Sequence, residues 1–94
     1  MPQRVRVSAQ VAEKMLIHKV NPVLTQAAME ARGTTVLLVE IGKKGDVLTA
    51  KVISGPALHR KPVLDAVRQY QYKPYLLNDT PVEVTTTVSV SLNE

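Results

Sequence analysis

The end of the chain carries its most regular alternation of apolar and polar positions. An extended segment over residues 82–92 has two faces, Val82, Val84, Thr86, Val88, Val90 and Leu92 on one, and Glu83, Thr85, Thr87, Ser89 and Ser91 on the other. This period of two predicts a long strand with one buried face and one small, polar, exposed face. The composition of Asn78 to Pro81 predicts a turn before it.

Two further β-rich runs lie on either side of a glycine-containing loop at Gly42 to Asp46, which predicts an antiparallel hairpin. The first arm, Val36 to Ile41, is apolar except for Glu40, so we expect it to be the more central strand. The second arm alternates, and its two expected faces are Val47, Thr49, Lys51 and Ile53, and Leu48, Ala50, Val52 and Ser54.

Helical spacing appears twice. Asn21-Pro22 offers a cap and a first helical residue, so we predict a helix from about Pro22 to Arg32, ended by Gly33. A second helix is predicted from about His59 or Arg60 to Gln71, with Pro62 near its start and Lys73-Pro74 after its end.

The segment before the first helix gives weaker signals. Arg4 to Val7 alternates like a short edge strand, Gln10 to Lys14 fits one helical turn, and Met15 to Val20 reads as extended. It either adds a strand or folds back over the edge of the last strand. The fold class is therefore α+β: a small antiparallel sheet of about three main strands packed against two helices, in the order helix–strand–strand–helix–strand, with a short N-terminal extended segment. We divide the chain into an extension, residues 1–20, and a domain, residues 21–94.

Composition narrows the function classes. The chain has 94 residues, 45% of them hydrophobic, no cysteine and a net charge of +4. Its longest apolar run, Val36 to Val39, is far shorter than the ~20 residues of a membrane span. The N-terminus has no apolar stretch typical of a signal peptide, so we expect any export signal in another part of the protein. The basic residues form no dense stripe and the aromatic residues are few, which argues against a nucleic-acid partner.

No residue pattern points to catalysis or to a metal. His18 and His59 lie apart, and neither has a second histidine or a carboxylate pair at ligand spacing; we interpret them as a strand-edge and a solvent-facing residue. Gly42-Lys43-Lys44-Gly45 joins two strands rather than opening a helix, so it lacks the geometry of a phosphate loop. We expect no enzymatic activity and no cofactor.

The last strand is the candidate functional element. If it lies at the border of the sheet, its outer N–H and C=O groups can pair with another extended peptide. Its exposed side chains include no lysine, and proline occurs only at its start. The alternative is an ordinary edge that the N-terminal segment or a second copy of the chain covers.

Several motifs, in this order and spacing, resemble the C-terminal domain of TonB-type energy transducers. They are Asn21-Pro22, Ala28-x-x-Ala31-Arg32-Gly33-Thr34, Ile41-Gly42-x-x-Gly45-Asp46-Val47, Val52-Ile53-Ser54-Gly55, Leu64-Asp65-Ala66-Val67, Tyr70-Gln71-Tyr72-Lys73-Pro74 and Pro81-Val82. The resemblance covers roughly Val20 to Leu92. The family commonly has Tyr-Pro at Asn21-Pro22, tryptophan at Tyr70 and Gly-x-Pro at Asp79-Thr80-Pro81.

The resemblance implies a periplasmic domain, anchored to the inner membrane and its motor proteins through a region absent from these residues. It implies that the last strand pairs with the TonB box of outer-membrane transporters and so transmits energy for uptake. The peptide-binding residues would be Glu83, Val84, Thr85, Thr86, Thr87, Val88, Ser89, Val90 and Ser91, with flanking contacts from Gln69, Tyr72 and Tyr75. The alternatives are a structural or dimerisation domain whose edge pairs with a second copy, and a sensor module of an envelope protein.

Overall fold

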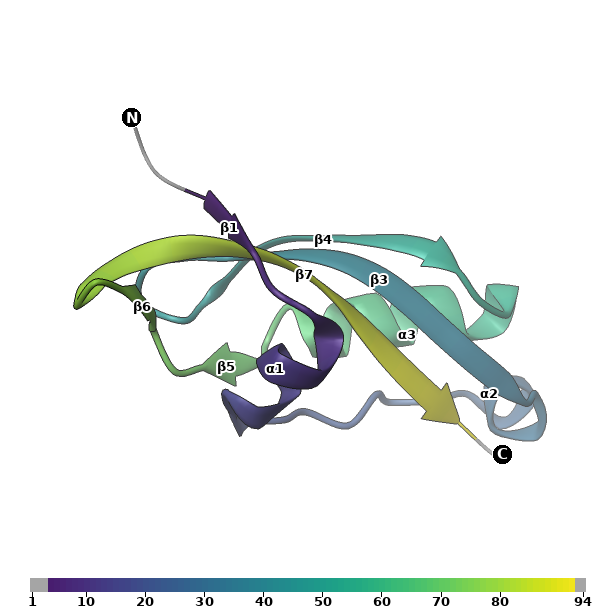
Figure 1. Ribbon diagram of the computed structural model, residues 1–94. Coiled ribbons are helices and arrows are strands. Elements are labelled where there is room, and N and C mark those ends of the chain that lie inside the picture. The colour runs from purple at the N-terminus through teal and green to yellow at the C-terminus, as the bar shows by residue number, and fades with distance from the viewer. Residues whose placement is uncertain (1–3, 93–94) are drawn as a thin grey trace.

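The computed structural model describes residues 4–92 and confirms a mixed α+β fold (Figure 1). Along the chain the elements are β1 (Arg4–Arg6), α1 (Ala9–Lys14), β2 (Leu16–His18), α2 (Gln26–Glu30), β3 (Gly33–Ile41), β4 (Val47–Ser54), α3 (Ala57–Val67), β5 (Gln71–Tyr72), β6 (Tyr75–Leu77) and β7 (Thr80–Leu92). The expected element order was incomplete, because the chain begins strand–helix–strand and adds two short strands after α3.

The main sheet has the strand order β1-β7-β3-β4, and β6 pairs with the start of β7. The antiparallel strands β7, β3 and β4 are the three main strands that the sequence predicted, and β3 is central between the other two. The sheet is larger than expected because β1 adds to β7 in parallel and β6 forms a hairpin with it. A separate two-stranded sheet joins β2 to β5.

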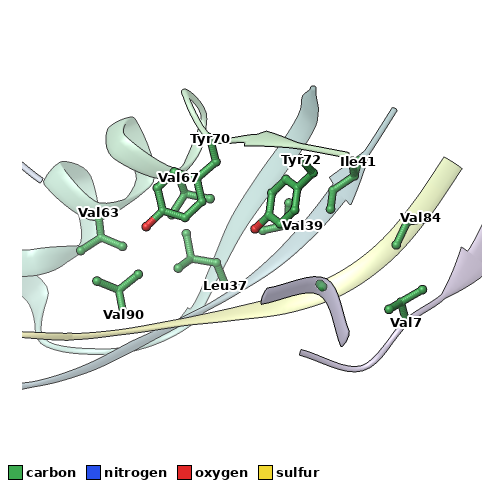
Figure 2. Close-up of a cluster of buried hydrophobic side chains, with 11 residues drawn as sticks. Val7, Leu37, Val39, Ile41, Val63, Val67, Tyr70, Tyr72, Val84 and Val90 are labelled. Atoms are coloured by element: carbon green, nitrogen blue, oxygen red, sulfur yellow. The ribbon is translucent and has the colours of Figure 1, made fainter. Parts of the chain in front are cut away.

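The core lies between one face of the sheet and the helices. Figure 2 shows Leu37, Val39 and Ile41 of β3 together with Val63 and Val67 of α3. Other members of the cluster come from β7, from the segment after α3 and from the N-terminus: Val84, Val90, Tyr70, Tyr72, Val7 and Ala12. Burying each large apolar side chain contributes about 1.5–3 kcal/mol. The N-terminal residues therefore share the core of the domain that follows them.

Two irregularities change the faces expected for β4. Its register with β3 shifts between the pairs Val36/Ser54 and Leu37/Val52, and again between Glu40/Thr49 and Ile41/Val47. Leu48 and Ile53 are the extra residues, and both are exposed. The predicted two faces were wrong because each bulge reverses the alternation, and Val47, Ala50 and Val52 pack together against the core.

The first main helix is shorter than expected. It begins after Thr25, whose hydroxyl accepts a hydrogen bond from the N–H of Ala28 at 3.2 Å, so Asn21 is not its cap. The chain is extended again at Ala31, and Gly33 begins β3 rather than ending the helix. Gly33 has φ +148° and lies directly against Pro56, where a side chain would not fit.

The second main helix begins and ends earlier than expected. It starts at Ala57 with Pro62 inside it, and it ends at Val67, so that Gln71 belongs to a strand. His59 is fully buried rather than solvent-facing. Its Nε2–H donates to the carbonyl oxygen of Ala28 at 2.8 Å, and this contact fixes α2 against α3.

The predicted turn before the last strand is confirmed and is tighter than its composition indicated. Asn78 and Asp79 have φ values of 51° and 67° and form the two-residue connection between β6 and β7. Asparagine and aspartate tolerate this left-handed conformation better than most residues. The last strand therefore begins at Thr80, two residues earlier than the alternation suggested.

Candidate functional site

The geometry of β7 determines which of its main-chain groups face solvent. The N–H of Val7 donates to the carbonyl oxygen of Thr85 at 3.0 Å, so the main-chain groups of Thr85 point away from β3. Because β7 keeps one register with β3 from Leu92 to Val84, the same direction applies to every second residue. Thr87, Ser89 and Ser91 therefore turn their N–H and C=O groups toward the outer edge.

The N-terminal strand already occupies one end of this edge. In β1, Arg4, Val5 and Arg6 lie opposite Glu83, Val84 and Thr85. The Arg4 guanidinium also forms ion pairs with Glu40 at 2.8 Å and Glu83 at 3.2 Å. In the part of the chain that the structure describes, no strand pairs with the outer edge from Thr87 to Ser91.

A pocket of about 340 Å³ lies beside this open stretch, and we call it the edge pocket. Its lining comes from α1, β2 and Lys19, from Thr87, Val88 and Ser89 of β7, and from Tyr70 and Tyr72. The inward-facing residues Thr86 and Val90 are buried, whereas Val88 between them is only partly buried. The edge pocket thus opens on the helix side of β7, next to its unpaired main-chain groups.

The two tyrosines have unusual surroundings. Tyr70 is 3% exposed, and its hydroxyl has no hydrogen-bond partner among the described residues. The ring centres of Tyr70 and Tyr72 are 6.4 Å apart, and Figure 2 shows both rings extending from the segment after α3 into the core. Burial, reinforced by the neighbouring Tyr70 and Glu13, raises the pKa of Tyr72 to about 12, so its hydroxyl stays protonated well above pH 10.

The hairpin loop and the N-terminal segment hold Tyr72 in place. The N–H of Tyr72 donates to the carbonyl oxygen of Gly45 at 2.9 Å, and the N–H of Lys73 donates to that of Met15 at 2.8 Å. Gly45 has φ +87°, and a Cβ there would overlap the carbonyl oxygen of Tyr72. Only glycine allows the loop to approach β5 this closely.

The structure separates the residues proposed for peptide binding into three groups. Thr87, Ser89 and Ser91 lie on the open edge, whereas Glu83 and Thr85 lie beside β1. The remaining members, Val84, Thr86, Val88 and Val90, direct their main chains to β3 and their side chains toward the core. The proposed edge is therefore shorter than the segment the sequence indicated.

The three predicted flanking contacts, Gln69, Tyr72 and Tyr75, lie in different places. Tyr72 lines the edge pocket. Gln69 is exposed after α3 and donates to the carbonyl oxygen of Asp65 at 3.1 Å, and Tyr75 pairs with Val82 in the β6–β7 hairpin. Sequence reasoning missed Tyr70 and α1 as walls of the pocket. The clustering of the tyrosines in one segment was a usable signal, whereas nothing local in α1 indicated its partner.

The two histidines and the acidic residues that the structure describes do not form a catalytic or metal site. His18 is exposed on β2 and His59 is buried beneath α2, far apart in the fold. Across residues 4–92 no three acidic or histidine side chains come close enough to hold a metal ion. None of the helices within that range has the length and apolar character needed to cross a membrane.

Comparison with known proteins agrees with the motifs. Residues 22–92, about three quarters of the chain, match the family model of the Gram-negative bacterial TonB protein C-terminal. A comparison with curated proteins gave no match. The matched family is a non-enzymatic transducer domain, periplasmic in Gram-negative bacteria, that interacts with outer-membrane transporters. The match confirms the predicted resemblance, and the chain belongs to the TonB C-terminal domain family.

Proposed function

We propose that this domain binds an extended segment of an outer-membrane transporter, the TonB box, by adding it as a strand to β7. The observation that carries the proposal is the run of main-chain groups at Thr87, Ser89 and Ser91, with which no strand in residues 4–92 pairs on the outer side. Each residue offers one donor and one acceptor to an added strand. The bound segment would begin where β1 leaves the edge.

The side chains of this stretch favour strand addition. Thr87, Ser89 and Ser91 are small and uncharged, so they neither block an approaching backbone nor repel it. Natural sheets usually protect such edges with lysine, proline or a bulge. Only the beginning of β7 has such protection, from Pro81, Glu83 and the covering β1.

The same geometry suits the transmission of force. β7 is anchored along its other side by nine paired residues of β3, so a pull on an added strand is shared across the sheet. Backbone pairing requires few specific side chains, which allows one domain to serve several transporters. In this role the domain would be periplasmic and coupled to an inner-membrane anchor and motor proteins through a segment outside these 94 residues.

Amide chemical shifts of the isotope-labelled chain, titrated with peptides from transporter N-termini, test the proposal. We expect the largest shifts at Thr87, Ser89 and Ser91. A scrambled peptide of the same composition serves as the control. Absence of shifts along residues 86–92 with every transporter-derived peptide would contradict the proposal.

The open edge also supports a second function, pairing with another copy of the chain. In such a dimer the Thr87–Ser91 edges of two chains would form one continuous sheet. Sedimentation equilibrium over a range of concentrations separates the two functions. A stable dimer whose edge amides are already protected would favour the dimerisation domain, and a monomer that binds peptide would favour the transducer.

A further inference from the structure

The edge pocket lies beside the stretch of β7 that an added strand would pair with. In an added strand, the residue opposite Val88 directs its side chain to the same face of the sheet as Val88. That face carries α1 and the core, because Ala12 of α1 belongs to the same buried cluster as Leu37 and Val39. An inward side chain of the added strand would therefore point into the edge pocket.

Size and lining indicate what the pocket can hold. Its volume of about 340 Å³ is at the lower end of ligand pockets, which suits a side chain better than a large ligand. Ala9, Ala12 and Leu16 provide small apolar walls along its length. These walls fit an unbranched apolar stem.

Tyr70, in the lining of the pocket, provides a polar contact. The hydroxyl of Tyr70 is buried without a partner in the described residues, and buried polar groups are nearly always hydrogen-bonded. Glu13 also lines the pocket, and its charge contributes to the raised pKa of Tyr72. A tyrosine hydroxyl can both donate and accept a hydrogen bond, so the unpartnered Tyr70 favours a guest side chain with a polar end group.

We propose, on the basis of the proposed function, that the edge pocket receives one linear side chain of the bound segment, ending in a polar group that forms a hydrogen bond with Tyr70. The outer edge of β7 then binds the main chain of the added segment, and the edge pocket selects one of its side chains. Two of its walls, α1 and β2, lie before residue 22 and so outside the matched family region. The selection therefore belongs to this chain and is not implied by the family match.

The test uses the full 94-residue chain and capped seven-residue peptides of alternating threonine and valine, with one guest at a central inward position. Glutamine and methionine guests have similar length, but only glutamine ends in a strong hydrogen-bonding group. Calorimetry should show the glutamine peptide binding about five-fold more tightly, the size expected of one hydrogen bond. Tyr70→Phe should reduce this ratio to below about two-fold, while the matched control Tyr75→Phe should leave it unchanged.

A second pair of variants tests the space itself. Ala9→Leu should fill the pocket and weaken both long-guest peptides about ten-fold relative to an alanine-guest peptide. Ala57→Leu, at the first residue of α3, is the matched control and should have no such effect. If the edge amides shift but all guest peptides bind with equal affinity, the role of the pocket is wrong and the proposed function stands. No edge shifts with any peptide would overturn both.

Discussion

The sheet has two outer edges, and they differ in how accessible their main chains are. The edge of β4 contains two bulges, at Leu48 and Ile53, and an exposed lysine, Lys51, between them. The edge of β7 keeps one register along its whole pairing with β3 and has small hydroxyl side chains. Bulges and lysines are the usual protection of sheet edges against unwanted pairing.

The difference shows which edge is available for a partner. On β4, Thr49 and Lys51 direct their main-chain N–H and C=O groups toward β3. Those of Ala50 and Val52 therefore point outward and are unpaired. They lie in a short stretch between bulges. On β7 the unpaired groups of Thr87, Ser89 and Ser91 are evenly spaced, and the edge pocket lies beside them. A strand can therefore add to β7 from Thr87 to Ser91 without distortion, and to β4 only with distortion.

The largest expected effect comes from proline on each edge. Ser89→Pro removes an outward N–H and puts a ring in the path of an added strand, whereas proline is tolerated at the edge itself. We expect peptide affinity to fall about a hundred-fold, about 2.7 kcal/mol, measured by calorimetry. The matched control Ala50→Pro changes an outward N–H of β4 and should leave affinity within two-fold. If both variants keep a native circular dichroism spectrum and lose peptide affinity equally, the proposed difference between the β7 and β4 edges is wrong.

A change in the hairpin loop should weaken the support of the pocket beside β7. Gly45→Ala places a Cβ against the carbonyl of Tyr72 at a positive φ, so we expect the free energy of unfolding to fall by about 2 kcal/mol. Urea denaturation measures this. Lys43→Ala, in the same loop and exposed, is the control and should change stability by less than about 0.5 kcal/mol. A stable Gly45→Ala variant would contradict the close contact.

The pH dependence of stability sharpens the comparison, because tyrosines lie beneath the edge of β7 and none lies in β4. Burial raises the pKa of Tyr72 to about 12 from 10.0, so the folded state retains a proton that the unfolded state loses. The resulting stabilisation is complete below pH 10 and is lost as the pH rises toward 12. Denaturation at several pH values should show this decline, and Tyr72→Phe should reduce it. An identical decline in the variant would exclude Tyr72 as its source.

The smallest effect concerns the strand that covers the beginning of β7. The ion pairs of Arg4 are solvent-exposed, and such pairs contribute about 0–1 kcal/mol. Arg4→Ala should therefore lower the free energy of unfolding by less than about 1 kcal/mol and leave peptide affinity within two-fold. Arg60→Ala, an exposed arginine on α3, is the control. A loss of several kcal/mol would show that β1 holds the edge of β7 in place.

The sequence predicted the parts of the fold that depend on local patterns. Alternation in residues 82–92 and the apolar run before Gly42 identified β7 and β3, and these strands position the site. The helix boundaries shifted because Thr25 caps α2 in place of Asn21 and because α3 begins before Pro62. The faces of β4 were wrong because a bulge is set by pairing with β3 rather than by composition.

The remaining parts depend on contacts between distant segments. β1 is three residues long, and its pairing partner Glu83 lies 79 positions from Arg4. The sequence raised a covered edge as an alternative, and the structure shows that β1 covers Glu83 to Thr85 in β7. Tyr70 falls within the helix predicted to Gln71, and its unpartnered hydroxyl in the pocket lining becomes evident only from the structure.

Amide hydrogen exchange of the chain, alone and saturated with a transporter-derived peptide, tests the central distinction most directly. In the free chain we expect fast exchange at Thr87, Ser89 and Ser91 and slow exchange at Val88 and Val90, which pair with β3. The peptide should slow the three outward amides of β7 at least ten-fold and leave Ala50 and Val52 of β4 unchanged. Slowing at Ala50 and Val52, or at neither edge, would contradict the assignment of β7 as the binding edge.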